Sequence, residues 1–274
     1  MSRSSIPASI AAYAILVIGA VFAVFPYLIT VLTAFKGPGE LFATLPWQPS
    51  WPPSLAAFDR LFESGFGGYL LNTVVVTVII VAGQLIFGTL AAYSFARIAF
   101  PGRDVLFWIY LSTMMVPAVV TMIPLYLMMQ RLGLIDSWAG LVLPTMFGTP
   151  YAIFLLRQFF RTIPADLEDA ARIDGAGTVR TLVSIILPLS KPILVTVTTL
   201  AVVGSWNSFL WPLIITSSQE KRLLSVGIAL FKGEVGVDYN AVMAGSLIAL
   251  APLLILFVFF QRFIVRSVAV TGLK

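Results

Sequence analysis

Four carboxylates within nine residues, at Asp166, Glu168, Asp169 and Asp174, form the densest acidic group in this chain. Carboxylates at such short spacing can coordinate Mg²⁺ or exchange protons with a substrate. The segment has a helix-forming composition, however, and a helix spreads these positions around its axis instead of directing them at one ion. The chain also has no histidine and no cysteine, so it lacks the usual acid–base catalyst near neutral pH and any thiolate ligand. Binding of a partner is therefore a better interpretation of this segment than catalysis.

The segment 166–175 is polar, yet it lies between two long apolar stretches. Its first carboxylates complement the positive end of the expected helix dipole, and Gly175 can end the helix with a positive φ. Leu167, Ala170 and Ala171 are expected to share one face. Two consecutive alanines allow a helix backbone to lie deep in the groove of a partner. The alternative is an amphipathic helix that only covers the cytoplasmic side of a membrane protein.

Composition indicates the class of the chain. Apolar residues make up 59% and charged residues 11%, where a soluble domain has about 25% charged residues. The apolar runs exceed what a globular core needs, so we expect an all-α, polytopic membrane protein. Each expected span has about 18 or more residues, enough to cross a hydrocarbon core of about 30 Å. We expect six transmembrane helices, at residues 10–35, 73–95, 105–129, 139–156, 193–215 and 242–265.

Basic residues predict the orientation. Of the 17 lysines and arginines, eleven fall on the side that holds both termini and the loop 157–191, and six fall on the opposite side. The positive-inside rule therefore places both termini and this loop in the cytoplasm. The first span is too long for a signal peptide and has no convincing cleavage site, so we expect it to be retained.

Seven residues of the loop stand at the spacing of a known motif. Permeases of ABC importers carry an EAA loop that reads Glu-Ala-Ala, three residues, Gly, nine residues, Ile-x-Leu-Pro. The matching residues here are Asp169, Ala170, Ala171, Gly175, Ile185, Leu187 and Pro188. Aspartate replaces the first glutamate, and Glu168 precedes it. With residues 206–213 in the fifth span, the chain resembles the carbohydrate-uptake branch of these permeases, and most closely the second, smaller membrane subunit of maltose-type importers.

The resemblance implies a type I ABC-importer permease fold over a single domain, residues 1–274, in a bacterial or archaeal inner membrane. It implies half of a translocation pathway for a sugar or sugar-like solute, such as an oligosaccharide, a polyol or a glycerol-phosphate compound. The implied partners are a second permease in a heterodimer, a pair of ATPase subunits, an extracytoplasmic substrate-binding protein and membrane lipids, with no nucleic acid.

The resemblance also implies that the loop is a coupling helix seated in a cleft of the ATPase. Its implied coupling residues are Leu167, Glu168, Asp169, Ala170, Ala171, Arg172, Asp174 and Gly175. The chain has no Gly-x-x-x-x-Gly-Lys-Ser/Thr loop, so it cannot bind the nucleotide in that way. ATP and Mg are expected on the partner ATPase; this chain is expected to be no enzyme and to hold no cofactor or metal.

Polar side chains within the spans are candidates for the translocation pathway, because they are costly in a membrane and often functional. Gln84, Trp206 and Asn207 are the residues we select, with the Trp206 ring suited to packing on sugar C–H groups. Asn207 has an alternative role as an interhelical hydrogen-bond donor between two permeases. Prolines are expected to kink the third and fourth spans, at Pro117, Pro124, Pro144 and Pro150.

Four prolines in residues 45–53 exclude a regular helix or central strand from the first outer loop. A short amphipathic helix is expected after Ser54. It would lie on the bilayer with Trp47 and Trp51 at the interface, or it would contact an external binding protein.

Two other classes of function remain to be weighed. An intramembrane enzyme would need acid–base residues near the bilayer surface, and the chain has no histidine and no carboxylate within an expected span. A membrane scaffold or assembly subunit would bind partners without moving a solute. ATP-dependent flux separates the transporter from the scaffold.

Overall fold

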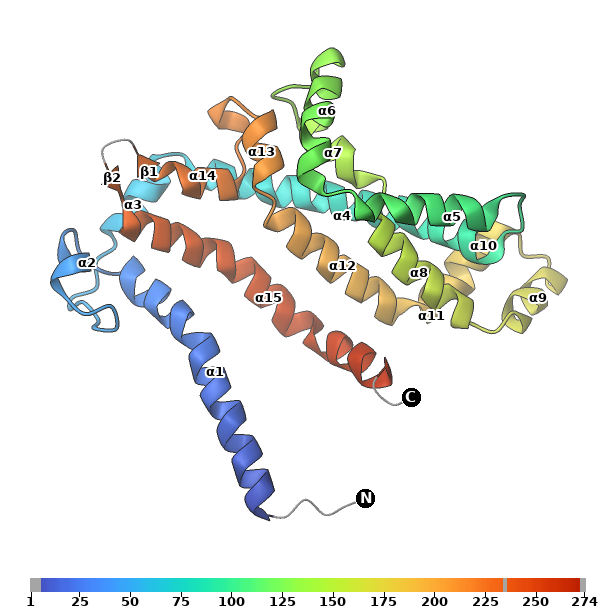
Figure 1. The fold of residues 1–274 in the computed structure, drawn as a ribbon, viewed down its shortest axis with the longest axis horizontal. Helices are drawn as coiled ribbons and strands as arrows, with labels where there is room; N and C mark the ends of the chain where they lie inside the picture. The colour runs from blue at the N-terminus through green and yellow to red at the C-terminus, as the bar shows by residue number, and fades with distance from the viewer. Residues whose placement is uncertain (1–5, 234–235, 272–274) are drawn as a thin grey trace. The chain divides into compact units, whose positions relative to one another are not determined.

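The computed structural model describes residues 6–233 and 236–271, and side chains over the narrower ranges 9–231 and 237–261. Helices dominate these residues (Figure 1), and the short antiparallel pair β1 (Lys232–Gly233) and β2 (Gly236–Val237) joins two of them. The chain divides into two compact units, Met1–Gly67 with Gly227–Pro252, and Gly68–Val226 with Leu253–Lys274. A single permease domain stays a prediction.

The first unit contains the long helix α1, the loop that follows it and the start of the last long helix. Its helices are α1 (Ile6–Ala34), α2 (Glu40–Ala43), α3 (Ala56–Glu63), most of α14 (Leu224–Leu230) and the start of α15 (Tyr239–Thr271). Asn240 Nδ2 donates to the carbonyl oxygen of Lys36 at 2.8 Å. The buried Lys36 Nζ donates in turn to Thr44 Oγ1 and to the Leu45 carbonyl, both at 2.8 Å. These bonds order the loop that follows α1.

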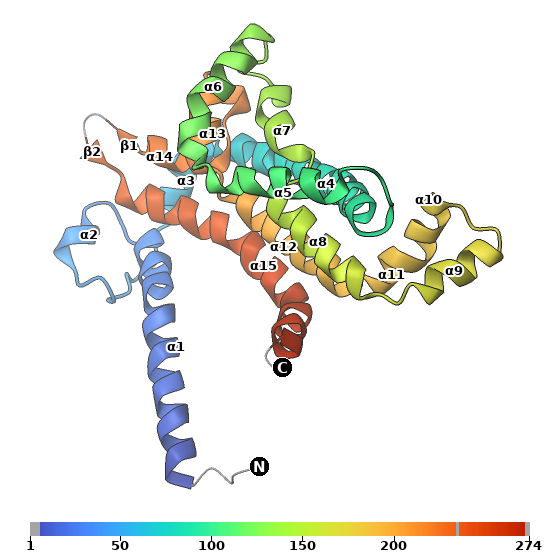
Figure 2. The same ribbon diagram turned by 45° about the vertical axis from the view of Figure 1, so that its right-hand side comes forward.

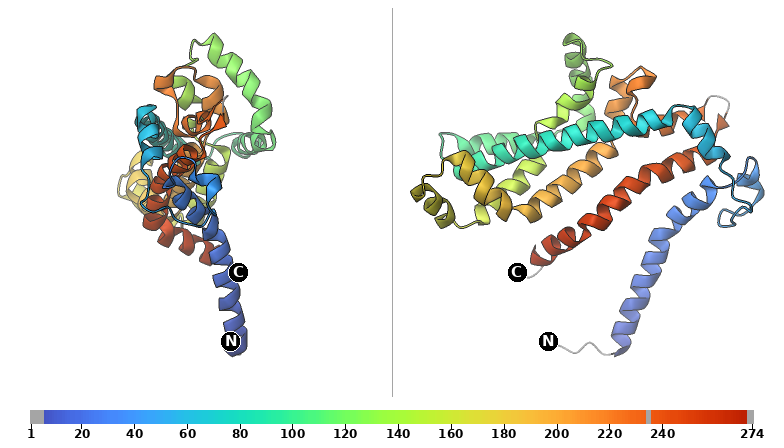
Figure 3. Two further views of the ribbon diagram at one scale, coloured as in Figure 1. Left: turned by 90° about the vertical axis from the view of Figure 1, so that its left-hand side faces the viewer. Right: turned by 180° about the vertical axis from the view of Figure 1, so that it is seen from behind.

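The second unit holds the remaining helices. They are α4 (Phe66–Arg97), α5 (Arg103–Ser112), η1 (Thr113–Met115), α6 (Ala118–Arg131), α7 (Trp138–Met146), α8 (Pro150–Thr162), α9 (Asp166–Ile173), α10 (Thr178–Thr181), the π-helical turn η2 (Leu182–Ile186), α11 (Leu187–Leu189), α12 (Lys191–Trp206), α13 (Leu210–Ile215) and η3 (Gln219–Lys221). Seen from behind, α4 runs as one long helix (Figure 3, right).

Four helical stretches of the described residues are long and apolar enough to cross a membrane, at Ser9–Ala34, Phe66–Arg97, Trp138–Thr162 and Tyr239–Gln261. Two bent pairs of helices pass the same test, and they raise the number to six if each pair is one span. Four of the six expected spans are therefore found at their general positions. The two bent pairs overlap the other two expected spans, but the second pair begins at Thr178, inside the expected loop 157–191, and ends at Trp206, before the expected end of the fifth span at residue 215.

The third expected span, 105–129, bends by 102° between η1 and α6. Val116 is extended at this bend, with φ −84° and ψ 118°, because the residue before a proline is disfavoured in the helical conformation. The fifth expected span, 193–215, is interrupted between α12 and α13. The ring of Pro212 would meet the backbone of residue 208 in a continuous helix, and Phe209 leaves the helical conformation.

Pro188 of the motif does not end the helical run. The helical run continues to Leu189, since proline is tolerated in the first turn of a helix. The sharp turn comes next, where the segment Thr178–Leu189 meets Lys191–Trp206 at 83°. The coupling loop therefore joins α12 through an elbow at Ser190.

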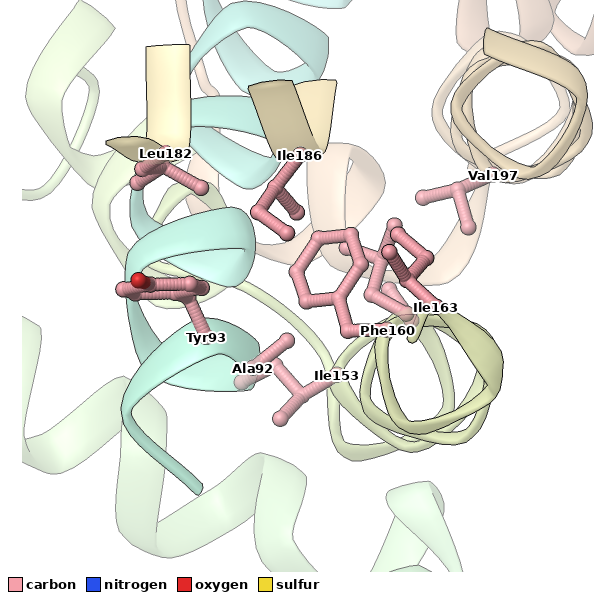
Figure 4. Packing of buried hydrophobic residues seen from close by; sticks show 10 residues of the cluster. Ala92, Tyr93, Ile153, Phe160, Ile163, Leu182, Ile186 and Val197 are labelled. Carbon is pink, nitrogen blue, oxygen red and sulfur yellow. The ribbon is translucent and has the colours of Figure 1, made fainter. Parts of the chain in front are cut away.

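One core cluster of the second unit joins α4, α8, η2 and α12. Figure 4 shows Phe160 at its centre, between Ile186 and Ile163, with Tyr93 and Leu182 on one side and Val197 on the other. A second cluster includes Val76, Leu141 and Ile215 and fills the space among α4, α7 and α13. The two clusters hold α4 against its neighbours along much of its length.

Asp136 ties two loops of the second unit together. Its Oδ1 accepts hydrogen bonds from the backbone N–H groups of Ser217 and Ser218 at 3.0 and 3.1 Å, and from Ser218 Oγ at 3.0 Å. These backbone donors hold the pKa of the Asp136 carboxyl below its ordinary value. Nearby, Trp211 Nε1 donates to the carbonyl of Gly140 at 3.0 Å, so α13 is also fastened to α7.

Candidate functional site

Helix α9 is the acidic segment of the sequence, and it begins at Asp166 and ends at Ile173. Figure 2 shows it at one end of the second unit, joined to α8 on one side and to α10 on the other. Three carboxylates lie in its first turn, where they stabilise the helix dipole. Gly175 follows with φ 79°, a conformation that glycine adopts without strain. The expected helix and its end are confirmed.

The helix has an inward face and an outward face. Glu168 and Ala171 are buried, while Asp169, Ala170 and Ile173 are exposed. The expectation that Ala170 and Ala171 share the docking face is wrong: Ala171 is only 7% exposed and packs against its own chain. Successive helical residues are turned by about 100°, so two adjacent alanines cannot both lie at the centre of one face.

Glu168 is held by two side chains of α4. Its Oε1 lies 2.8 Å from Nε of Arg97 at the end of α4, and its Oε2 accepts a hydrogen bond of 3.1 Å from the hydroxyl of Tyr93. The Arg97 guanidinium also donates to the carbonyl of Phe160, at 2.7 Å, and to that of Ile163. Helix α9 is thus anchored to α4 and to the end of α8 through one buried carboxylate.

The outward face has charges and two large apolar side chains. Arg172 and Asp169 form an exposed ion pair of 3.1 Å, a kind of pair that contributes little to stability. Leu167 and Asp174 are exposed as well, and the Ile173 side chain is 88% exposed. An isolated helix face of this composition is suited to a groove with apolar and polar contacts.

Sequence reasoning missed three residues of this site. Arg97 was counted only for orientation, and Tyr93 was read as part of an apolar span. No spacing rule connects them to Glu168, which lies 71 residues beyond Arg97. Ile173 could have been found from the helical wheel, because it is opposite the buried positions 168 and 171.

A cavity of about 450 Å³ lies within the second unit, beside α4. Its lining comes from α4, α6, α7, α8, α12, α13 and the segments next to them. The polar lining residues are Gln84, Thr121, Thr145, Thr149, Tyr151, Ser205, Ser208 and Trp211, and none of the described residues that line the cavity carries a charge. Such a chamber can take an uncharged solute that offers hydroxyl groups.

The three expected pathway residues do not lie together. Gln84 lines the cavity and donates from Nε2 to the carbonyl of Thr145 at 3.0 Å. Trp206 is buried and does not line it, and Asn207 is exposed and bonds to the Val203 carbonyl at 2.9 Å within its own helix. Asn207 is the C-terminal cap of α12, at the break between α12 and α13.

The acidic residues do not converge on an ion. Within residues 6–233 and 236–271, no group of three or more His, Cys, Asp or Glu side chains could hold a metal. The site therefore consists of a helical surface on α9, an uncharged cavity, and the helix α4 between them.

Comparison with known proteins decides the family. The family described as the binding-protein-dependent transport system inner membrane component matches residues 84–270, more than half of the chain. This chain belongs to that family. The permease is 35% identical over 260 residues to the arabinooligosaccharides transport system permease protein AraQ of Halalkalibacterium halodurans, with 93% of this chain and 92% of that protein covered. It is 33% identical to the sn-glycerol-3-phosphate transport system permease protein UgpE of Yersinia pestis, with 92% of each chain covered.

A solved structure agrees with the sequence relatives. The permease matches a chain of a bacterial ABC transporter involved in the import of the acidic polysaccharide alginate, with a TM-score of 0.83 and 28% identity. The match covers 96% of this chain and 98% of that one. The resemblance to carbohydrate-uptake permeases and the helical type I importer fold are confirmed. The permease is a multi-pass membrane subunit of an ABC importer, which implies a partner permease and a separate ATPase.

Proposed function

We propose that this permease forms half of the pathway for a neutral sugar or sugar-like solute. The observation that carries the proposal is the cavity itself, whose lining carries no charge and includes Gln84 and several hydroxyl side chains. Its volume of about 450 Å³ lies in the range of about 300–1,000 Å³ that is usual for small-molecule sites. Relatives named for arabinooligosaccharides and for sn-glycerol-3-phosphate support a hydroxyl-rich solute. The absence of charge in the lining favours the neutral one.

Energy for transport comes from the partner ATPase, which binds ATP and Mg. We place α9 in a cleft of that ATPase, with both termini and the loop 157–191 in the cytoplasm. Its outward residues Leu167, Asp169, Ala170, Arg172, Asp174 and Ile173 make the contact. Glu168, Ala171 and Gly175 set the position and the end of the helix. An extracytoplasmic binding protein delivers the solute on the opposite side.

Gln84 is the side chain that we assign to the solute. Trp206 and Asn207 take part in the same pathway indirectly, because they end α12 beside the break that precedes α13. They set the point at which α12 ends in the wall of the pathway, and we do not assign them a contact with the solute.

The test is transport by the complete importer in proteoliposomes. The tagged permease is purified from its host with its partners, reconstituted, and supplied with the co-purified binding protein. A panel of radiolabelled neutral oligosaccharides and polyols is compared with glycerol 3-phosphate, with ATP inside the vesicles and without it. ATP-dependent accumulation of a neutral solute supports the proposal. An assembled complex that hydrolyses ATP and moves none of these compounds would instead act as a scaffold.

A further inference from the structure

The ion pair between Arg97 and Glu168 is nearly closed to solvent. The two side chains are 15% and 5% exposed, and their nearest charged atoms are 2.8 Å apart. Tyr93 and two backbone carbonyls satisfy further polar atoms of the pair. Charged groups are expensive to bury, and an apolar pair of similar volume would often stabilise a fold as well. The burial of this ion pair therefore points to a role beyond stability, through the elements that the pair connects.

The ion pair connects helix α9 to helix α4. Glu168 is on α9, whose outer face is free for the ATPase. Arg97 is the last residue of α4, a helix of 32 residues with no proline inside it. Ile80 and Gln84 of α4 line the cavity, and 17 residues of helix place Ile80 about 25 Å from Arg97. A rigid helix thus runs from the ion pair to the cavity wall.

A second, covalent connection leads from the same loop to the same cavity. The chain continues from α9 through α10, η2 and α11 to the elbow at Ser190, where it bends by 83° into α12. Leu200 and Ala201 line the cavity from the C-terminal part of α12, the part farther from the elbow. A movement of α9 therefore reaches α12 through the continuous backbone. The same movement reaches α4 through the contact between Arg97 and Glu168.

We propose that Arg97 and Glu168 form a latch that transmits movement of α9 to α4, so that α4 and α12, two of the helices that line the cavity, move together. Glu168 and Arg97 are positioning residues in this scheme, and they do not touch the solute. The inference rests on the proposed function, because it requires an ATPase that moves α9. Without the latch, ATP-driven movement still reaches α12 and fails to reach α4.

The experiment uses the complete importer in proteoliposomes and two single-cysteine reporters, which the cysteine-free chain allows. Ile80→Cys reports on α4, and Ala201→Cys reports on α12. A small water-soluble thiosulfonate reagent is the probe, and its labelling rate is measured with and without Mg-ATP and vanadate. In the unsubstituted background both rates should change on addition of nucleotide.

Glu168→Gln removes the charge and keeps the shape of the side chain. The latch predicts loss of the nucleotide-dependent change at position 80, with the change at position 201 retained. Asp166→Asn is the matched control, because it removes a charge from the exposed first turn of the same helix, and both reporters should respond in it. Tyr93→Phe, which deletes one hydroxyl beside Glu168, should weaken the response at position 80 alone. If Glu168→Gln fails to assemble, the response of Tyr93→Phe at position 80 tests the latch instead.

Two results in the substituted permeases would overturn the latch while leaving the proposed transport intact. One is a full response at position 80 in Glu168→Gln or, where that variant does not assemble, in Tyr93→Phe. The other is an equal loss at positions 80 and 201, which would mean that Glu168 only supports the fold of the loop. A complex with no response at either position before any latch substitution would overturn the proposed ATP-driven transport, and the latch with it.

Discussion

Replacing Ile173 by alanine tests the docking face of α9 directly, because 88% of this side chain is exposed in the free chain. The substitution removes three carbon atoms. At about 0.8 kcal/mol for each buried methylene, full burial of Ile173 in the ATPase cleft makes the loss about 2.4 kcal/mol. That free energy corresponds to ATPase binding that is weaker by about 50-fold. The stability of the permease itself should change by less than about 0.5 kcal/mol, since an exposed side chain is lost.

The assay is a titration of purified ATPase against the permease pair in lipid nanodiscs. Ile123→Ala is the matched control: it makes the same chemical change at a side chain that is 71% exposed on α6, in an expected membrane span. It should leave the affinity for the ATPase unchanged. Equal affinities for the unsubstituted permease and the folded Ile173→Ala variant would refute the assignment of this face.

Three further predictions concern other parts of the molecule. Ala170→Asp should weaken ATPase binding at normal complex yield, whereas Ala171→Asp should lower the yield in detergent, because burying an unpaired carboxylate costs several kcal/mol; equal yields would contradict the two-face description. Gln84→Leu should raise the KM for uptake with ATPase binding intact, and unchanged uptake kinetics would remove Gln84 from the pathway. The carboxyl of Asp136 has a lowered pKa, so it stabilises the folded state above its ordinary pKa of about 4, and this stabilisation is lost as the pH falls through the lower folded value. Thermal unfolding between pH 5 and pH 3 should therefore depend on pH less steeply in Asp136→Asn than in the unsubstituted protein.

The positions of four spans and the existence of α9 could be predicted from the sequence, because they depend on local composition. Long apolar runs define the spans, and α9 lies between carboxylates in the first turn and Gly175. The expected short helix of the outer loop is also present, as α3. In each case the determining residues are neighbours along the chain.

The rest depends on contacts between distant residues. The inward direction of Glu168 follows from Arg97 and Tyr93, which the sequence places far away. The prolines at 117 and 212 indicate breaks, but they do not predict the angle of 102° at the first one. Gln84 lines the cavity and Trp206 does not, and polarity alone does not show which side of a helix faces a chamber.

The hydrogen bonds to Asp136 should slow hydrogen–deuterium exchange in the loop that they hold. Backbone amides in loops normally exchange with solvent rapidly, because their local opening requires little free energy. The amides of Ser217 and Ser218 are bonded to a carboxylate, so their deuterium uptake should be slow for a loop. With α13 packed on both α6 and α7, we expect these three helices to keep their arrangement during the transport cycle. Deuterium uptake elsewhere in the permease can then be scaled to these two amides, which serve as a built-in reference.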